Sequence, residues 1–430
     1  PEPTPAAEPP PPPTTPTSPP PASSPTLDAL TTAEHDPGRP FDLHWHLLNL
    51  PGYVLEIAVL PLQFAVELTE RYRLDRRVAD VFEIAGGAVK ISPRVKLAFG
   101  DGLGIGAKLK FPRLLERRAA LAVGGLYRLD GDWLIDGSYV QRLGSVERRT
   151  LRLRAGAERD ANERYYGIGG GSRELDRRAL RNDDQGLFLG FDVFASDSYD
   201  WSGVLELGAY RQSLAGGSDA AHPPVGGPDD MIEVPPGFDD AAVFAHLALA
   251  MRYDTRDTKG RPTKGSLIDL GLIGRSDGGG LSGALVSATA RWFAPVLRDA
   301  RVLVLTLGGS AALPLFRDST IPLSMLSTLG REHFLRGYDR ARFRDRYALW
   351  TSLEYRYPIY EYLTTGAGLD AFLFTDAATA FGVDALTAER LRYSAGGGLR
   401  GAHETVLVFE LTVGYSPEGL QIFFGAERPL

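Results

Sequence analysis

The chain has 430 residues, no cysteine, 49 glycines and a formal net charge of −7 at pH 7. The lack of cysteine excludes disulfides, thiol nucleophiles and thiolate metal sites, and the acidic balance argues against nucleic acid as a partner, because phosphate binding needs a basic face. No apolar run of about 18 residues exists, which argues against an ordinary membrane helix, but a membrane barrel needs none, because only alternate residues meet lipid.

The first 40 residues form a proline-rich segment. Residues 1–40 contain 15 of the 31 prolines, mixed with Thr, Ser and Ala, so they cannot bury a core. We expect a disordered tether here, either a plain spacer or a docking segment. Because the chain begins with Pro1, we interpret it as processed or trimmed, with its secretion signal removed.

Residues 41–83 form a second predicted region. The mostly apolar stretch 47–68 is interrupted by Pro51 and Pro61, and a charged stretch follows at 70–77. Two prolines argue against one straight spanning helix, so we expect a kinked helical segment in the periplasmic membrane interface, with a signal anchor as the alternative. His44 and His46 lack a third ligand nearby, so no metal site and no cofactor is predicted.

From residue 84 to the end, the sequence alternates with period two. Leu151 and Leu153 alternate with Arg152 and Arg154, and the same pattern of apolar and charged residues recurs over 349–357 and 405–415. An apolar face opposite a charged face is typical of a barrel wall between lipid and water. A soluble sandwich would have to bury Arg and Glu in its core.

Sixteen such segments are predicted, which makes residues 84–430 an all-β, sixteen-stranded antiparallel transmembrane barrel. Every second connection is fairly short, and the other set includes the long loops 161–184, 215–241 and 313–346, as in outer-membrane barrels. The segments cover 87–98, 103–112, 118–128, 132–143, 148–160, 185–196, 200–214, 242–254, 265–276, 282–293, 300–312, 347–358, 367–377, 391–401, 405–415 and 419–428.

The loop 313–346 is the sixth external loop on this count, and its centre reads Leu335-Arg336-Gly337-Tyr338. The next two strands offer Glu354, and Phe374 with Asp376 on one face. If these groups share a lumen, the carboxylates hold the arginine by charge-assisted hydrogen bonds, and Gly337 permits a tight turn. The lock either stabilises the barrel or takes part in transport, and both readings are compatible.

Four motifs resemble the outer-membrane assembly and surface-antigen barrels of the BamA and TamA type. They are the Leu335–Tyr338 motif in the sixth loop, Glu354 on the strand after it, the Phe374-Thr375-Asp376 strand, and a turn formed by Asp254, Arg256, Asp257, Pro262 and Gly265. The resemblance covers about 85–430. It implies a non-enzymatic outer-membrane protein with a periplasmic N-terminus, which inserts or translocates protein or lipid.

The chain departs from the family pattern in three places. Only some 40 residues separate the tether from the barrel, too few for the family's periplasmic (POTRA) domains, so we expect a short member that relies on a periplasmic partner. Asp376-Ala377-Ala378 replaces the family's Asp-x-Gly, and the chain ends in Pro429-Leu430 without a terminal aromatic residue. Glycines at 86–87 and Pro429 weaken strand pairing, which predicts either a lateral seam or ordinary strand ends.

The expected partners are outer-membrane lipids and client barrel proteins or lipids. A passive or gated pore is the alternative function, with Arg152, Arg154, Arg356 and Glu410 setting its selectivity. An enzyme is a third class, but no Gly-x-Ser-x-Gly elbow occurs, and only a triad assembled in space would supply one. Gly260–Ser266 imitates a phosphate loop, but its Lys264 precedes the second glycine, so we interpret it as a turn.

Overall fold

The computed structural model describes residues 83–84, 88–98, 102–115, 118–143, 149–194, 200–219, 221–227, 232–296, 301–331, 334–362, 367–382, 390–403 and 406–429. The predicted tether over 1–40 and the histidine pair in the next region lie outside these ranges. So does the predicted helical segment over 41–83, except for Glu83. Within the described part, no helix has the length and apolarity needed to cross a membrane.

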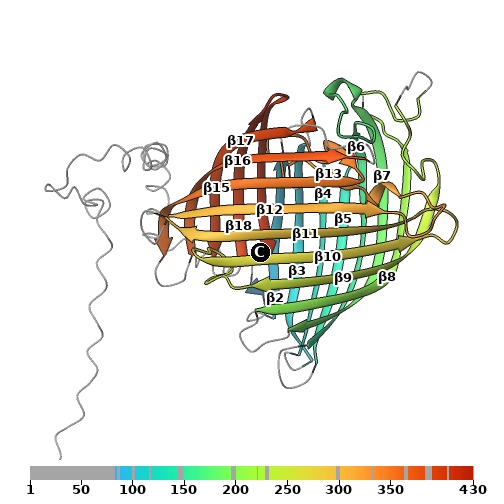
Figure 1. Ribbon diagram of the computed structural model, residues 1–430. Coiled ribbons are helices and arrows are strands. Elements are labelled where there is room, and N and C mark those ends of the chain that lie inside the picture. The colour runs from blue at the N-terminus through green and yellow to red at the C-terminus, as the bar shows by residue number, and fades with distance from the viewer. Residues whose placement is uncertain are drawn as a thin grey trace, which may run out of the picture. The chain divides into compact units, whose positions relative to one another are not determined.

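In the described residues, sixteen antiparallel strands lie side by side in a wall that curves into a barrel, and a two-residue strand, β1 (Glu83–Ile84), joins the same sheet (Figure 1). This confirms the predicted fold class and strand number. The strands are β2 (Val89–Ala98), β3 (Gly102–Leu114), β4 (Ala119–Arg128), β5 (Trp133–Arg142), β6 (Arg149–Tyr165), β7 (Arg178–Phe194), β8 (Trp201–Gly216), β9 (Ala241–Asp254), β10 (Gly265–Ser276), β11 (Ser282–Pro295), β12 (Val302–Leu313), β15 (Tyr347–Tyr362), β16 (Ala367–Phe381), β17 (Arg392–His403), β18 (Val406–Ser416) and β19 (Gly419–Pro429).

The two ends of the barrel differ in their connections. At one end, called the short-turn end, the strands are joined by connections such as 255–264 between β9 and β10. At the long-loop end, longer segments follow β6, β8 and β12, and the first of them contains the 3-10 helix η1 (Glu174–Asp176). β6 and β7 run several residues farther into this end than the sequence predicts. Their charged tips were predicted as loop, but they continue pairing up to Tyr165 and Arg178.

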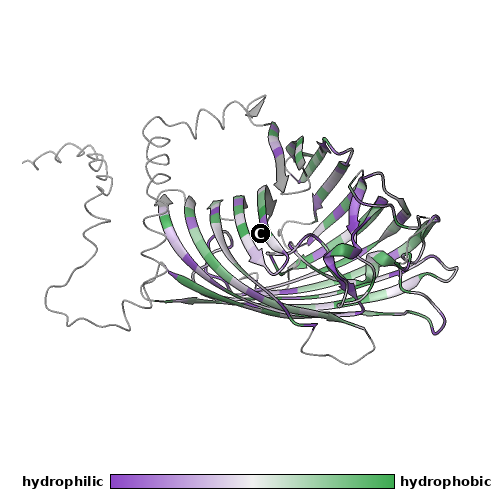
Figure 2. Ribbon diagram, turned by 90° about the horizontal axis from the view of Figure 1, so that it is seen from above, coloured by the Kyte–Doolittle hydropathy of each residue, from purple (hydrophilic) through white to green (hydrophobic). Residues whose placement is uncertain are grey.

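The wall is apolar outside and charged inside. Along the strands, hydrophilic and hydrophobic residues alternate (Figure 2), and Ile105, Leu187 and Val243 are among the exposed apolar side chains. The opposite face of the strands carries ion pairs, such as Arg154 Nη2 with Glu206 Oε2 at 2.5 Å. Buried arginines and carboxylates on this face match a polar lumen and would not suit the core of a soluble sandwich.

The sixth loop, residues 314–346 between β12 and β15, has structure of its own. It contains the 3-10 helix η2 (Leu323–Met325) and a small hairpin of β13 (Ser327–Leu329) and β14 (Phe343–Asp345). Alternation with period two does not reveal this hairpin, because strands of three residues are too short to show the pattern. Buried apolar side chains of the loop pack against Trp350 and Ala378 of β15 and β16.

The barrel closes where β19 meets β2, and this junction is short. Three residue pairs join the two strands, from Phe423 with Ala98 to Gly425 with Lys96. Every other pair of neighbouring barrel strands has at least nine. The two-residue strand β1 (Glu83–Ile84) pairs with Lys90 and Val89 near the other end of β2. Pro429 ends β19, where it still pairs with Val406.

Candidate functional site: a loop lock in the barrel lumen

The side chain of Arg336 connects the sixth loop to the barrel wall. Its Nη1 donates to Glu354 Oε2 at 2.6 Å, and its Nη2 donates to Asp376 Oδ1 at 2.8 Å and to Ser352 Oγ at 2.9 Å. Nε and the backbone N–H both donate to the other oxygen of Asp376, at 3.1 and 3.0 Å. The guanidinium carbon lies 3.7 Å from the centre of the Phe374 ring. A planar fork with several donors makes these contacts together, whereas a lysine ammonium could not.

Strand register explains why these partners meet. Ser352 lies opposite Asp376 and Glu354 lies opposite Phe374 on the paired strands β15 and β16. Because side chains alternate across a strand, all four point to the same face of the sheet. Asp376 is 1% exposed and Glu354 is 6% exposed. Water cannot solvate these carboxylates fully, so the hydrogen bonds from their donors must offset the free-energy cost of burying the charge.

Glu354 is shared by three arginines. Besides Arg336, it accepts a hydrogen bond from Arg356 Nε at 2.7 Å and from Arg400 Nη1 at 3.2 Å. Arg400 also donates to Glu410 Oε2 at 3.0 Å. The sequence analysis placed Arg356 and Glu410 in the lumen but did not connect them to the lock, and it missed Ser352 and Arg400. Alternation along β15 and β17 places both residues on the lumen face of the strands, and this was the sequence signal from which they could have been found.

Gly337 lies in the expected tight turn, which the Tyr338 amide closes by donating to the Leu335 carbonyl oxygen at 3.0 Å. It does not adopt a left-handed backbone conformation, so the predicted tight-turn role is not what requires glycine there. Instead, a Cβ at this position would lie 2.7 Å from both Ser394 Cβ and the Tyr415 carbonyl oxygen. The loop backbone passes so close to β17 and β18 that only glycine fits.

The other two motif residues form the packed part of the loop tip. Leu335 is fully buried and Tyr338 is 2% exposed, in a cluster with Phe343 and Trp350. Leu335 and the neighbouring Phe334 have φ values of 64° and 63°, a left-handed conformation that L residues adopt at a cost of about 1–3 kcal/mol. The contacts of the loop with the wall must offset this strain. The conformation of the loop tip therefore depends on its packing against the barrel wall.

Further ion pairs hold the loop at the long-loop end. Arg342, which is 1% exposed, donates to both oxygens of Glu418 in the hairpin between β18 and β19, at 2.8 and 2.7 Å. Arg344 pairs with Glu163 of β6. Asp339 accepts a 2.8 Å hydrogen bond from the Tyr166 hydroxyl. The arginine-rich segment is thus a set of contacts to separate parts of the barrel.

The predicted turn lies at the short-turn end, between β9 and β10. Arg256 donates to both oxygens of Asp254, at 2.8 Å each. Pro262 is buried, and Gly265 has a φ of +104°, where a Cβ would lie 2.3 Å from the Thr255 carbonyl oxygen. All five predicted residues therefore belong to one compact turn, which Asp257 completes.

The carboxylate of Asp257 organises the backbone of this turn. It accepts hydrogen bonds from the amides of Thr258 and Thr263 at 2.9 Å and of Lys264 at 3.3 Å, and from the Thr263 hydroxyl at 2.5 Å. Burial on its own would raise the pKa of Asp257, but these hydrogen bonds favour the charged form and hold the pKa below its usual value.

The turn and the lock border the same cavity. Arg256, Lys259 and Pro262 line a lumen cavity of about 400 Å³ together with Arg336 and Glu354. Arg261 of the turn also reaches β16, where its Nη2 donates to Asp370 Oδ1 at 2.6 Å. The two motifs are far apart in sequence, but both act on the lumen face of β15 and β16.

Among the described residues, no group of three or more His, Cys, Asp or Glu side chains could hold a metal ion. The arrangement instead allows charge pairing, loop anchoring and the passage or exclusion of solutes.

Fold and site define a class: a transmembrane β-barrel of the outer-membrane type, whose sixth loop folds into the lumen. Residues 239–415, which contain the lock and the turn, match the Omp85 superfamily domain. This confirms the resemblance predicted from the four motifs. A comparison with curated proteins finds no match.

Solved structures support the same fold. BamA from Haemophilus ducreyi, in a crystal structure lacking POTRA domains 1-3, is 16% identical with a TM-score of 0.57, over 79% of this chain and 70% of that one. CdiB from Escherichia coli is 12% identical with a TM-score of 0.53, over 79% and 63%. This chain therefore spans less than two thirds of CdiB. At these identities the likeness establishes the fold alone.

Proposed function

We propose that this protein is a non-enzymatic outer-membrane biogenesis factor that inserts or translocates protein or lipid through a lateral seam between β2 and β19. The observation that carries the proposal is the three-residue junction of these strands. The N-terminus lies in the periplasm and the sixth loop is external. The clients are barrel proteins or lipids, and a periplasmic partner helps to recruit them.

The seam is the place where the wall costs least to open. A β-ladder is held by backbone hydrogen bonds, and three paired residues supply few of them compared with the nine or more at every other junction. Beyond these pairs, β2 pairs with β1 only at Val89 and Lys90. An edge with free backbone groups is a template for an incoming strand, which is how many proteins bind extended partners.

The loop lock stabilises the wall on one side of the seam. Arg336 and Gly337 contact β15 to β18, and Arg342 contacts the hairpin that leads into β19. The strands before β19 are thus held together by the loop. We infer that opening separates β2 from β19 while β15 to β18 remain fixed.

A disulfide across the seam tests this proposal, and the lack of native cysteine makes the test clean. Leu97→Cys and Phe424→Cys place the pair at register partners of β2 and β19. We expect the oxidised protein, reconstituted in liposomes, to insert a barrel client at least tenfold more slowly than the reduced protein. Reduction should restore the rate of insertion.

The matched control is a disulfide between two strands that are already paired along most of their length. Leu249→Cys and Leu272→Cys are register partners on β9 and β10, and their disulfide should leave insertion unchanged. Full activity of the oxidised seam variant would contradict a lateral route and would leave the lumen as the path.

A gated pore is the second candidate. Lumen cavities of about 400 and 690 Å³ border the sixth loop on different sides, and charged side chains line both. The lodged loop argues against steady conductance, so a pore would have to open by loop movement.

A further inference from the structure

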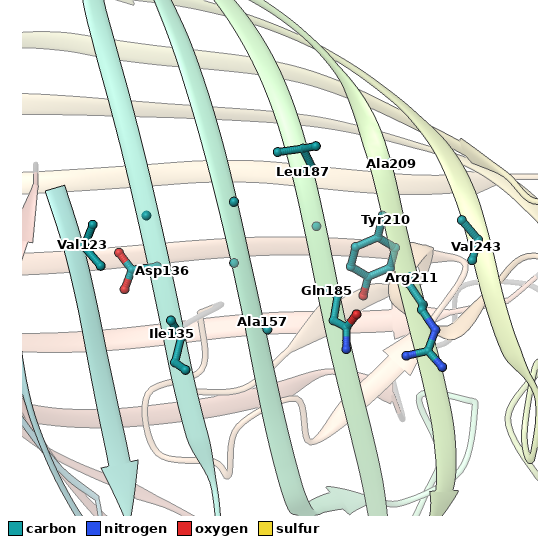
Figure 3. Close-up of a pocket in the computed structure, with 14 residues that line it drawn as sticks. Val123, Ile135, Asp136, Ala157, Gln185, Leu187, Ala209, Tyr210, Arg211 and Val243 are labelled. Atoms are coloured by element: carbon teal, nitrogen blue, oxygen red, sulfur yellow. The ribbon is translucent and has the colours of Figure 1, made fainter. Parts of the chain in front are cut away.

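The outward face of β5 to β9 has an apolar depression of about 550 Å³ (Figure 3). Small residues line it: Gly137 of β5 is the register partner of Ala155 of β6, Ala157 lies two residues farther along β6, and Ala209 lies on β8. Larger exposed apolar side chains surround the small ones: Val123, Ile135, Leu187 and Val243. The wall is thus hollowed where it faces lipid, with room for a hydrocarbon chain.

A polar rim borders the depression toward the long-loop end. Gln185 and Arg211 are direct register partners and extend in the same direction from neighbouring strands (Figure 3). Farther along the same face, Arg159 Nε lies 2.5 Å and Arg181 Nε lies 3.5 Å from the carboxylate of Asp183. Arg159 and Arg181 share this one carboxylate, and Arg211 forms no ion pair among the described residues, so three guanidiniums stand against one carboxylate. The rim is therefore positively charged.

The rim lies at the height of a membrane boundary. Trp201 and Tyr253 pack 4.6 Å apart at the short-turn end of β8 and β9, as in an aromatic belt. Ten residues lead from Trp201 to Arg211, about 34 Å along a strand. A tilt of about 45° reduces this to roughly 24 Å, close to the apolar height of ~25 Å in such barrels. At the opposite, long-loop end, Arg159 lies 5.9 Å from the ring centre of Trp133, the first residue of β5, so an aromatic residue also stands beside the rim.

We propose that this part of the wall is a binding site for an outer-leaflet lipid with a phosphorylated headgroup. The phosphate binds Arg211 and Arg159, and an acyl chain fills the depression below. Guanidinium donates two parallel hydrogen bonds to phosphate oxygens, which suits arginine better than lysine for this role. An apolar hollow directly beneath a cationic rim at the membrane boundary fits a lipid and does not fit a soluble protein. The site rests on the outer-membrane placement of the barrel and is independent of the seam.

Native mass spectrometry of the purified barrel in detergent tests the site. The probe is bis-phosphorylated lipid A, compared with the same lipid after its phosphates have been removed. We expect the wild type to retain one phosphorylated molecule, with at least tenfold preference over the dephosphorylated form. Arg159→Gln combined with Arg211→Gln should reduce this retention about tenfold. Ala209→Trp should also reduce it, because it fills the depression and leaves the rim intact.

Arg149→Gln is the matched control, because Arg149 is an exposed arginine on the same strand β6 at the short-turn end. It should retain lipid like the wild type. Equal retention of both lipid forms by the wild type would overturn the proposal without need of any variant. Equal retention by the double variant and the wild type would show adventitious lipid only. Heat-dependent electrophoretic mobility of each protein verifies that the barrel is folded.

Discussion

Glu354 balances more charge than any other residue of the lock. Three guanidiniums contact it, whereas Glu410 accepts from Arg400 and from the Thr412 hydroxyl. Replacing Glu354 leaves buried cations without their common partner, and removal of one member of a buried ion pair costs about 3–5 kcal/mol.

We therefore expect Glu354→Gln to lower the melting temperature of the folded barrel more than Glu410→Gln does. The measurement is the heat-dependent shift in electrophoretic mobility, which reports barrel unfolding in detergent. Because Glu410 has 18% of its side chain exposed against 8% for Glu354, water compensates part of its loss. An equal effect of the two substitutions would show that Glu354 is not the centre of the network.

Gly337 supports a second prediction at the residue scale. Gly337→Ala places a methyl group 2.7 Å from atoms of β17 and β18, and overpacking of this kind costs about 1–3 kcal/mol. We expect the loop tip to leave its seat part of the time and trypsin to cleave faster at its arginines. Gly171→Ala is the control, because nothing lies within 4 Å of a Cβ there. Equal cleavage rates in both variants would contradict the close-approach argument.

The sequence predicted the charge partners of the lock better than its neutral ones. Arg336, Glu354 and Asp376 could be paired because charged residues on a lumen face need opposite charges, and period two identifies that face. Ser352 lies on the same face, but a serine is common in any strand and carries no such requirement. Gly337 was predicted to lie in a tight turn, and it does. Its close approach to β18 could not be predicted, because that approach depends on tertiary packing that the sequence does not display.

At the scale of elements, the turn between β9 and β10 depends on one carboxylate. The folded-state pKa of Asp257 is lower than the value of about 3.9 in an unfolded chain. Its contribution to stability is therefore fully present above that value and is lost as the pH falls through the folded pKa. Asp257→Asn should destabilise the turn by about 1 kcal/mol at pH 7.

The lowered pKa of Asp257 also determines how this destabilisation depends on pH. The difference in melting temperature between wild type and Asp257→Asn should be present at pH 7 and should shrink at an acidic pH below about 3.9, as the pH falls toward the lower folded-state pKa. Asp240→Asn is the control, an exposed aspartate at the long-loop end that should show no difference at either pH. If the difference in melting temperature were the same at both pH values, the effect of Asp257→Asn would not come from the loss of the carboxylate charge.

Strand prediction succeeded where one face meets lipid and failed where it does not. The sixteen barrel segments alternate because each residue faces either lipid or the lumen. Beyond the membrane, the tips of β6 and β7 have polar residues on both faces, so their pairing leaves no period-two signal. The β13–β14 hairpin is stabilised by packing against Trp350 and Ala378, which are distant in sequence.

For the whole molecule, we expect the sixth loop to decide whether the lumen conducts. The cavity beneath the lock is lined by an excess of cations over carboxylates. Of these, Arg291 forms no ion pair among the described residues, while Arg252 pairs with Asp269 at 2.6 Å. A lumen with unbalanced positive charge concentrates anions.

Replacing residues 331–344 with two glycines should therefore convert a mostly closed barrel into a steadily conducting one in planar bilayers, with greater permeability for chloride than for potassium. Arg291→Gln in the same background should lower that preference, because it removes a lumen cation that forms no ion pair among the described residues. The wild-type barrel should show only rare openings. Steady conductance of the wild type would instead support the pore as the native function, and a preference for potassium would show that the carboxylates dominate the lumen field.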